Sequence, residues 1–502
     1  MKQAYLISQG LEEFAAAREQ FGLLLSTLQS EQTLQMQHGQ LEETIAREGN
    51  ELLRRLLQGH LDLRSVRELR VEQIVGADGV VRDQCRAHCE RQLMTLFGEV
   101  SVRRMGYGAR GVESIFPLDR ELNLPTDKYS HGLRQRVAQE VAKGSFDAAV
   151  ASVEQTTGGK VPKRQAEEIA VEVSEDFTAF YEQRQAEGPE ATDDPLILSQ
   201  DGKGIIMRME DLREVTRKAA QRTGHKLKTR LSQGEKRNRK RMALVAAAYT
   251  VAAQVRSPEA IMGLEPCEEP PRSRARNKRV WASVARDPGV VTEELFAEAL
   301  RRDPEQRRVW VMLVDGHQDQ LKHIQASIKR HGVSVILVLD FIHVLEYLWK
   351  AAYCFYAPGT EQAEAWVAER ALQILRGKAA HVAAGMRRSA TLRGLSAEDR
   401  QAVDTCAGYL HRYKDMLKYD EYLAQGLPIA TGVIEGACRH LICDRMDITG
   451  ARWRLPRAEA ILKLRSLQSS GDSAEYWDFY KAQVLKRNHA SRYQETELAE
   501  AA

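Results

Sequence analysis

Two short apolar runs, each closed by an aspartate, constrain the fold of this chain more than any other feature. The runs are "VWVMLVDG" (309–316) and "VSVILVLDFIH" (333–343), and unbroken apolar character over so few residues is typical of strands buried on both faces. Between them, "QLKHIQASIKRHG" (320–332) has the apolar spacing of an amphipathic helix. A buried strand, a helix and a second buried strand in this order predict an α/β sheet.

The sequence upstream adds three strands and a helix to this pattern. "LILSQDGKGIIMRM" (196–209) predicts a strand, a turn at Gly202–Gly204 and a second strand. "RMALVAAAYTVAAQV" (241–255) is a third strand, with a helix as the alternative, and "TEELFAEALRRD" (292–303) is a helix capped by Thr292. The order β-β-β-α-β-α-β, followed by a helical block from about 343 to 425, predicts an α/β class and matches a ribonuclease H-like core with a helical insertion.

The N-terminal region has a different, mainly α-helical character. Residues 10–75 have helical apolar spacing and no proline, which predicts one or two long amphipathic helices that pack on the core or pair with a second copy. "FGEVSVRRMGYGARG" (97–111) alternates like a small hairpin. A helix capped by Ser145, a break at Gly158–Gly159 and a new helix from Pro162 form a helix-turn-helix pattern, although two packed helices without a DNA role fit equally.

Length and composition exclude several classes of protein. A chain of 502 residues exceeds one ordinary domain, so two or three domains are expected. No apolar run is long enough for a membrane span, and the first residues lack a signal peptide, so we expect a cytoplasmic protein without a membrane partner. The seven cysteines are expected to be reduced. Cys85 and Cys89 have no second pair nearby, which favours two helix-face thiols over a zinc site.

The acidic residues at the predicted strand ends suggest a chemistry. Asp201, Asp315 and Asp340 each lie at or just past the end of an apolar strand, where open α/β sheets place functional residues. Any one of them alone is more often a helix cap. Together with Glu435, in the first turn of a helix that follows Thr431, they can converge on one point. Several carboxylates at one point are what two Mg²⁺ ions require for phosphoryl transfer.

Four stretches resemble ISKra-type insertion-sequence transposases, which are DDE transposases related to Mutator-like elements. These stretches are "LSQDGKGI", "VMLVDGHQDQL", "LDFIHVLEYLW" and "GVIEGACRHLICDRMDITGARW". The resemblance covers roughly 80–490 and is strongest over 196–470. It implies a ribonuclease H-like core that uses Mg²⁺ to cut DNA at transposon ends and then joins the freed 3′-hydroxyl to target DNA.

The resemblance also implies the roles of individual residues. Its first carboxylate lies on strand one and its second at the end of strand four, so counting strands selects Asp201, Asp315 and Glu435 as ligands of two Mg²⁺ ions, for which Mn²⁺ can substitute. Asp340 and His343 match an aspartate-x-x-histidine motif of Mutator-like relatives and form a supporting pair, with Asp340 as the alternative second aspartate. Many relatives carry a cysteine pair after the hairpin tyrosine. Here "YGARGVES" has none, so no zinc module is expected.

Basic residues predict a nucleic-acid partner locally, although the formal net charge is only +3. The stretch 213–241 is rich in lysine and arginine with only two acidic residues, and a dense run of this kind favours contact with DNA phosphates over a solvated face. Trp453 either stacks on an unpaired base or lies in the core. The candidate DNA-binding residues are Lys163, Arg164, Lys236, Arg237, Arg239, Lys240, Arg241, Arg439, Arg452 and Trp453.

The sequence therefore predicts a bacterial transposase that acts on double-stranded DNA with terminal repeats and on target DNA, as a homodimer or larger homo-oligomer. Two alternatives remain: a catalytically silent DNA-binding protein derived from a transposase, and a nuclease that cuts without joining. The predicted divisions are 1–80 (paired helices), 81–185 (hairpin and helix-turn-helix), 196–345 (core), 346–428 (helical insertion), 429–470 (helix with the catalytic glutamate) and 471–502 (tail).

Overall fold

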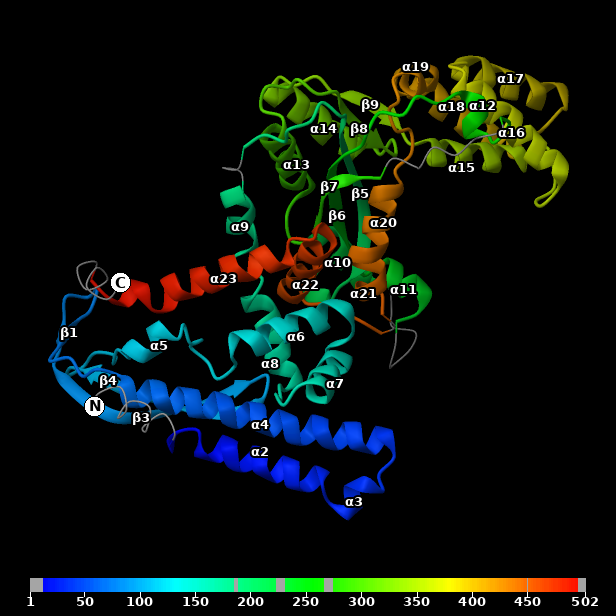
Figure 1. Cartoon of the computed structure of the whole chain (residues 1–502). Coiled ribbons are helices and arrows are strands. Elements are labelled where there is room, and N and C mark those ends of the chain that lie inside the picture. The colour runs from blue at the N-terminus through cyan, green and yellow to red at the C-terminus, as the bar shows by residue number, and fades with distance from the viewer. Residues whose placement is uncertain (1–11, 185–187, 223–230, 266–273, 449, 495–502) are drawn as a thin grey trace. The chain divides into compact units, whose positions relative to one another are not determined.

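The computed structural model describes residues 12–184, 188–222, 231–265, 274–448 and 450–494 (Figure 1). It divides into two compact units. One contains Met1–Phe180 with Asp472–Ala502, and the other contains Tyr181–Gly471. Within the described residues, no helix has both the length and the apolar character that a membrane span requires.

The first unit begins with a helical hairpin. Helix α2 (Ala15–Leu28) and the 30-residue α4 (His38–Arg67) lie against each other, with the short α3 (Glu31–Leu34) between them. Gln20 donates to Glu48 at 2.9 Å across the pair. The prediction of one or two long amphipathic helices in residues 10–75 is therefore confirmed, and the two helices pair with each other.

A two-stranded sheet and a group of three helices follow. Strands β3 (Gln84–Thr95) and β4 (Gly98–Gly108) form the predicted hairpin, which begins earlier than its alternation indicated. Cys85 and Cys89 lie on β3, so their assignment to a helix face is wrong. The helices are α6 (His131–Lys143), α7 (Phe146–Thr156) and α8 (Lys163–Glu172), and the five-residue α5 (Pro117–Glu121) precedes them.

Local chemistry fixes the connection between α7 and α8. Ser145 caps α7 as predicted, since its hydroxyl accepts from the backbone N–H of Ala148 at 3.1 Å. Gly158 and Gly159 lie so close to the β3–β4 turn that a Cβ on either would meet a backbone oxygen, that of Phe97 for Gly158 and that of Thr95 for Gly159. Glycine at both positions therefore lets the connection pack against the hairpin.

The C-terminal residues are part of the first unit, so their prediction as a tail is wrong. Helix α23 (Ser473–Asn488) follows residue 471, and the hydroxyl of its buried Tyr476 donates to the carbonyl of Val173 at 2.6 Å. Arg487 pairs with Asp176 at 3.0 Å. Phe180, at the start of α9 (Phe177–Arg184), packs edge-on against Tyr476.

The second unit is built on a five-stranded mixed sheet, which confirms an α/β class. Its order is β7-β6-β5-β8-β9; β5, β6 and β7 pair antiparallel, and β8 and β9 run parallel to β5. The strands are β5 (Leu196–Ile206), β6 (Lys240–Thr250), β7 (Arg276–Ser283), β8 (Trp310–Val314) and β9 (Ile336–Leu339).

The predicted turn at Gly202–Gly204 does not exist. Strand β5 runs through both glycines because β6 pairs with it along its whole length, from Leu196 opposite Thr250 to Ile206 opposite Lys240. Gly204 also makes room for β6, since a Cβ there would lie 2.7 Å from the Lys240 side chain. The predicted second strand is thus part of β5, and β7 is the strand that the sequence analysis missed.

Helices cover both faces of this sheet. Figure 1 shows α13 (Pro288–Arg302) and α14 (Gln318–His331) on one side and α20 (Gly432–Ala437) on the other. Helix α13 begins at Pro288, earlier than predicted, and its buried Thr292 donates to Gln200 of β5 instead of capping the helix. Helix α22 (Leu455–Ser470) lies along β7.

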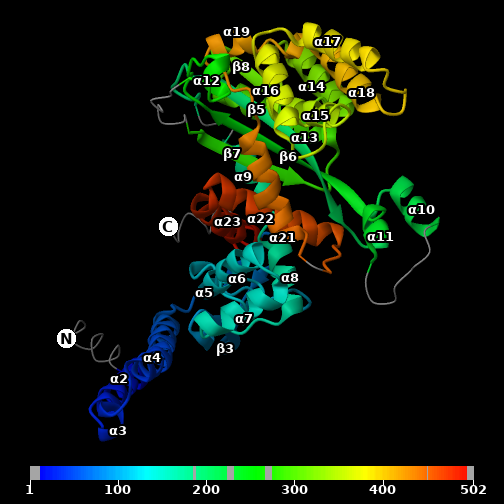
Figure 2. The same cartoon turned by 90° about the vertical axis from the view of Figure 1, so that its right-hand side faces the viewer.

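Between β9 and α20 the described chain is helical. Figure 2 shows these helices grouped at one end of the second unit. They are α15 (Phe341–Ala352), α16 (Glu361–Leu375), α17 (Ala379–Leu392), α18 (Gln401–Arg412) and α19 (Tyr419–Ala424).

The packing of α23 predicts that the first unit depends on the C-terminal helix. Tyr476→Ala removes a fully buried ring and its hydrogen bond, and we expect the free energy of unfolding of this unit to fall by about 3–5 kcal/mol. Hydrogen exchange should accelerate in residues 163–180. The exposed Lys486→Ala on the same helix is the matched control. Unchanged exchange in the Tyr476 variant would mean that α23 contributes nothing to this unit.

Candidate functional site

Strand register places the three predicted aspartates in one row. Ser199 of β5 lies opposite Leu313 of β8, so the same register two residues on brings Asp201 opposite Asp315. Likewise Val314 lies opposite Leu339, and the next pair is Asp315 with Asp340. Neighbouring strands are about 4.8 Å apart, and residues opposite one another point to the same face. The sheet therefore places these three aspartates on neighbouring strands, on the same face.

Asp201 lies inside β5 and not at its end, so the predicted position is wrong although the residue is half-buried at the sheet surface. One carboxylate oxygen accepts from the backbone N–H of Gly202 at 2.6 Å, and the other accepts from the Cys438 thiol at 3.2 Å. Burial and the nearby Asp201 charge raise the pKa of Cys438 far above its usual value. The thiol therefore keeps its proton and remains a donor to Asp201.

Asp315 is the first residue after β8, in a turn that two tyrosines of the helical block hold. Its carboxylate accepts from the backbone N–H of His317 at 2.7 Å, and its carbonyl accepts from the hydroxyl of Tyr409 at 2.9 Å. The Tyr413 hydroxyl donates to the carbonyl of Gly316 at 2.6 Å. Burial raises the pKa of Tyr409 far above its usual value, so this hydroxyl also stays protonated.

Gly316 is required in this turn for two reasons. Its φ of +87° lies in the left-handed region, where a side chain is strained. A Cβ at this position would also lie 3.1 Å from the Tyr413 ring and 3.2 Å from the Tyr409 ring. The turn after Asp315 is thus fixed by its own backbone and by α18.

Asp340 has a structural role. It is fully buried and caps α15, accepting from the backbone N–H of Ile342 at 2.8 Å, and its second oxygen accepts from the hydroxyl of Thr431. Burial raises the pKa of its carboxyl group. His343 is only partly buried, and its ring lies 3.7 Å from the carboxylate of Glu346. Among the described residues, no hydrogen bond joins His343 to Asp340.

Glu435 is exposed in the first turn of α20. Thr431 precedes the helix as predicted, but its hydroxyl bonds to Asp340 and does not cap α20. Three residues after Glu435, Cys438 begins a π-helical segment (Cys438–Cys443), and its thiol contacts Asp201. Because residues three apart share a helix face, Glu435 lies about one turn from the contact with Asp201.

The acids of this site have no positive partner among the residues that the structure describes. Neither Asp201, Asp315 nor Glu435 forms an ion pair with any described residue. The described side chains do not include three His, Cys, Asp or Glu residues gathered closely enough to hold a metal ion. Two uncompensated carboxylates in one register and a third on the adjoining helix are, however, the hard-oxygen donors that a divalent cation would neutralise.

The two candidate residues of the helix-turn-helix lie at the start of α8 and are exposed. Lys163 pairs with Asp147 of α7 at 2.7 Å, and Arg164 pairs with Glu168 at 3.1 Å. Exposed pairs of this kind are weak and can exchange for a phosphate.

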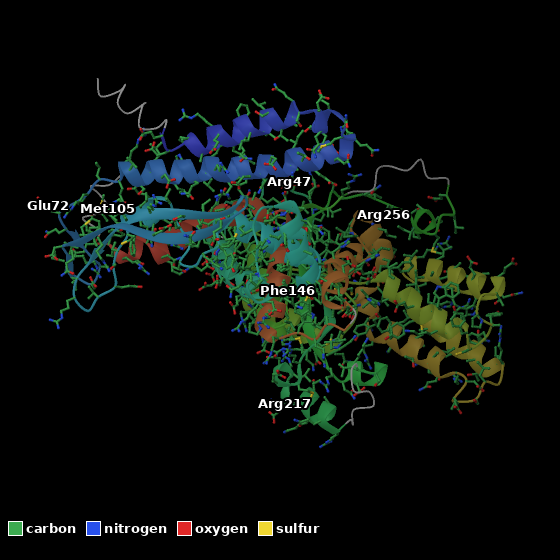
Figure 3. The ribbon with its side chains drawn as sticks, turned by 90° about the horizontal axis from the view of Figure 1, so that it is seen from below. Arg47, Glu72, Met105, Phe146, Arg217 and Arg256 are labelled. Atoms are coloured by element: carbon green, nitrogen blue, oxygen red, sulfur yellow. The ribbon has the colours of Figure 1, made fainter. Side chains whose placement is uncertain are left out.

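The basic run 213–241 divides into exposed and structural residues, and residues 223–230 lie outside the described chain. Its described helices are α10 (Glu214–Arg222), which carries Arg217 (Figure 3), and α11 (Gln233–Arg237). Lys236, Arg237 and Lys240 are exposed.

Two other candidate DNA-binding residues of this run, Arg239 and Arg241, are less exposed. Arg241 donates to the carbonyls of Val284 at 2.8 Å and Ala285 at 3.3 Å, and Arg239 is buried. The Arg241 guanidinium group thus already satisfies backbone carbonyls, and its contact with DNA stays a prediction.

Trp453 is a core residue, which is the second of its two predicted alternatives. It is 6% exposed, its indole N–H donates to the carbonyl of Met446 at 3.0 Å, and Arg445 stacks 4.8 Å from the ring centre. Arg452 is exposed beside it. Arg439 is exposed one turn after Glu435, with its nearest carboxylate, Asp444, at 3.7 Å.

The residues that sequence reasoning missed are those that position the acids: Cys438, Tyr409 and Tyr413. The spacing of Cys438 from Glu435 was a visible signal, whereas the tyrosines lie far from Asp315 in sequence. Cys85, Cys89, Cys354, Cys406, Cys438 and Cys443 are free thiols, and Cys267 lies outside the described residues.

Comparison with known proteins adds no identification. No family model matches the chain, and no curated protein matches it either.

The raised pKa of Asp340 predicts a pH-dependent effect of Asp340→Asn. A carboxyl group whose pKa is higher in the folded state loses stabilising free energy as pH rises from its unfolded value of 3.8 through the folded value. An amide does not titrate, so the free energy of unfolding of the variant, relative to the parent chain, should increase over that interval and then level off. Denaturant unfolding at several pH values measures this difference. A pH-independent difference would contradict the raised pKa.

Proposed function

We propose that this protein is a DDE transposase whose carboxylates Asp201, Asp315 and Glu435 hold divalent cations for DNA cleavage and strand transfer. The observation that carries the proposal is the register of β5 with β8, which when continued by two residues sets Asp201 opposite Asp315. The Cys438 thiol, directly after the helix that carries Glu435, also contacts Asp201. None of the three acids is neutralised by a described basic residue.

The arrangement of strands supports a ribonuclease H-like core. The resemblance described above implies a carboxylate on strand one and a second at the end of strand four. In the second unit β5 is the first strand and carries Asp201, and β8 is the fourth and ends before Asp315. The strand count that selected Asp315 included one strand too many in β5 and omitted β7, and these errors cancel.

Asp201, Asp315 and Glu435 supply the hard carboxylate oxygens that two Mg²⁺ ions, or Mn²⁺ in their place, would take as ligands. When bound, such ions stabilise the attacking and leaving oxygens of phosphoryl transfer. Cys438 orients the Asp201 carboxylate, and Tyr409 and Tyr413 fix the turn that carries Asp315. Asp340 stays in the interior, where it joins α15 to the residue before α20.

The unpaired acids favour an enzyme over a silent DNA-binding protein, because a binding protein for a polyanion gains nothing from three uncompensated carboxylates. A nuclease on the same fold would share the site. A strand-transfer assay with the terminal repeats that flank the gene separates the two, since only a transposase joins the cut end to target DNA.

The partners follow from the surfaces. We infer that α8 reads terminal-repeat DNA, with Lys163 and Arg164 at its exposed start. We also infer a homodimer through the N-terminal hairpin, where Phe21, Leu25 and Leu53 are 51%, 45% and 46% exposed.

Substitution of each acid should separate catalysis from binding. Asp201→Asn, Asp315→Asn and Glu435→Gln should each abolish cleavage while DNA affinity stays nearly unchanged, because each loses a negative charge at a metal site and not a packing contact. Asp340→Asn should impair cleavage less than Asp315→Asn, and the exposed Glu421→Gln is the control. The reverse order for the two aspartates would make Asp340 the second ligand.

The exposed part of the basic run should bind DNA phosphates. Changing Lys236, Arg237 and Lys240 to Gln should weaken binding of all duplexes similarly. It should also flatten the plot of log affinity against log salt, by up to roughly 0.9 for each phosphate that is no longer neutralised. Preference for terminal repeats should survive, since phosphate contacts carry no sequence information. Arg239 and Arg241 are left in place because of their burial and carbonyl contacts. An unchanged salt slope would show that this run is a solvated face.

A further inference from the structure

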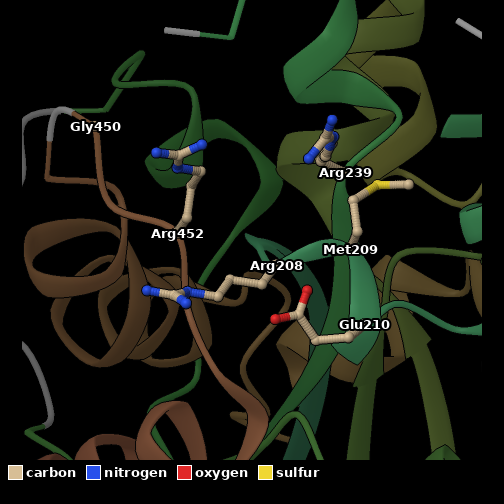
Figure 4. A pocket seen from close by; sticks show the side chains of 6 residues that line it. All are labelled: Arg208, Met209, Glu210, Arg239, Gly450 and Arg452. Atoms are coloured by element: carbon tan, nitrogen blue, oxygen red, sulfur yellow. The ribbon is translucent and has the colours of Figure 1, made fainter. Parts of the chain in front are cut away.

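Beyond the end of β5, three arginine side chains line one pocket of about 450 Å³ (Figure 4). They are Arg208, Arg239 and Arg452. The remaining lining residues are Met209, Glu210 and Gly450. The pocket lies within the second unit and is separate from the row of aspartates.

Backbone hydrogen bonds hold the three arginines in place. The N–H of Met207 donates to the carbonyl of Arg239 at 2.9 Å, and the N–H of Arg208 donates to the carbonyl of Trp453 at 2.9 Å. The N–H of Trp453 donates in turn to the carbonyl of Ile206 at 3.0 Å. The segment that carries Arg208 is thus hydrogen-bonded to both of the other two, and the buried Trp453 anchors the segment that carries Arg452.

The pocket has an excess of positive charge. Its one carboxylate, Glu210, pairs with Arg454 at 2.9 Å. Arg208 and Arg452 are exposed, and neither forms an ion pair within the part of the chain that the structure describes. An anion in the pocket would offset this positive charge. The planar guanidinium group matches a phosphate through two parallel hydrogen bonds.

We propose that this pocket binds a backbone phosphate of a nucleic-acid strand. Its volume exceeds that of a lone phosphate and accommodates a nucleotide, and the exposed Lys236 and Arg237 lie on α11, just before Arg239 in the chain. Arg208 is seven residues beyond Asp201, so the pocket lies roughly 20 Å from the acids along β5.

For a DNA strand that follows β5 from the acids to the pocket, at about 3.4 Å per nucleotide, this separation corresponds to roughly six nucleotides. The pocket therefore binds the phosphate about six nucleotides from the scissile bond. That assignment of position rests on the proposed function, whereas the binding itself does not.

The test is a methylphosphonate scan of one strand of a terminal-repeat duplex, in which each substitution removes one phosphate charge. Binding is measured by fluorescence anisotropy in Ca²⁺. The test variant is Arg208→Gln with Arg452→Gln, and the matched control is Lys378→Gln with Arg388→Gln, two exposed basic residues of the helical block.

The parent chain and the control should bind about tenfold more weakly when the substitution falls at one position, roughly six nucleotides from the cut. The double variant should bind the unmodified duplex about as weakly as the parent chain binds the duplex that is substituted at this position. A methylphosphonate at this position, and at no other, should leave the affinity of the double variant unchanged. A double variant with the parent's sensitivity at every position overturns the proposal. A second result would also overturn the proposal: inorganic phosphate raises the thermal stability of the parent chain, and duplex DNA does not displace that phosphate. This result would assign the pocket to a small ligand. If no DNA is cleaved but the position-specific weakening is seen, the proposed function fails and the pocket assignment stands.

Discussion

The parallel pairing of β5, β8 and β9 is the constraint on which the second unit depends. Hydrogen bonding between these strands fixes their register, and the register alone brings Asp201, Asp315 and Asp340, distant in sequence, into one row. A shift of one residue in any pair would turn one carboxyl group to the opposite face of the sheet, because successive side chains alternate. The chemistry of the site is therefore a consequence of backbone pairing.

The helices decide which members of the row can bind a ligand. Thr431 and the start of α15 enclose Asp340, which leaves it buried and structural. Asp201 stays at the surface and is oriented by Cys438, on the same helical stretch as Glu435. Here the helix widens into a π-helical segment, a feature often found at functional sites. Tyr409 of α18 and Tyr413, directly after it, reach the turn that follows Asp315, so the helical block between β9 and α20 supports the site directly.

The sequence predicted those features whose cause is local. Apolar runs identify β8 and β9, and Ser145 caps its helix as its position indicates. The sequence could not show where strand pairing overrides the local preference of a residue for a turn. Gly202 is typical of a turn, but β6 pairs with β5 along its whole length and holds Gly202 in the strand. Nor could composition separate an arginine that meets DNA from one that satisfies carbonyls, as the hydrogen bond from Arg241 to Val284 illustrates.

The central claim, that Asp201, Asp315 and Glu435 share a divalent cation, can be tested without DNA. Fe²⁺ in place of Mg²⁺, with ascorbate and peroxide, generates hydroxyl radicals that cut the backbone beside the metal. The account predicts cuts near residues 201, 315 and 435, suppressed by excess Mg²⁺ and absent from Asp201→Asn. Cuts near residue 340 without cuts near 435, or no Mg²⁺-sensitive cuts at all, would contradict it.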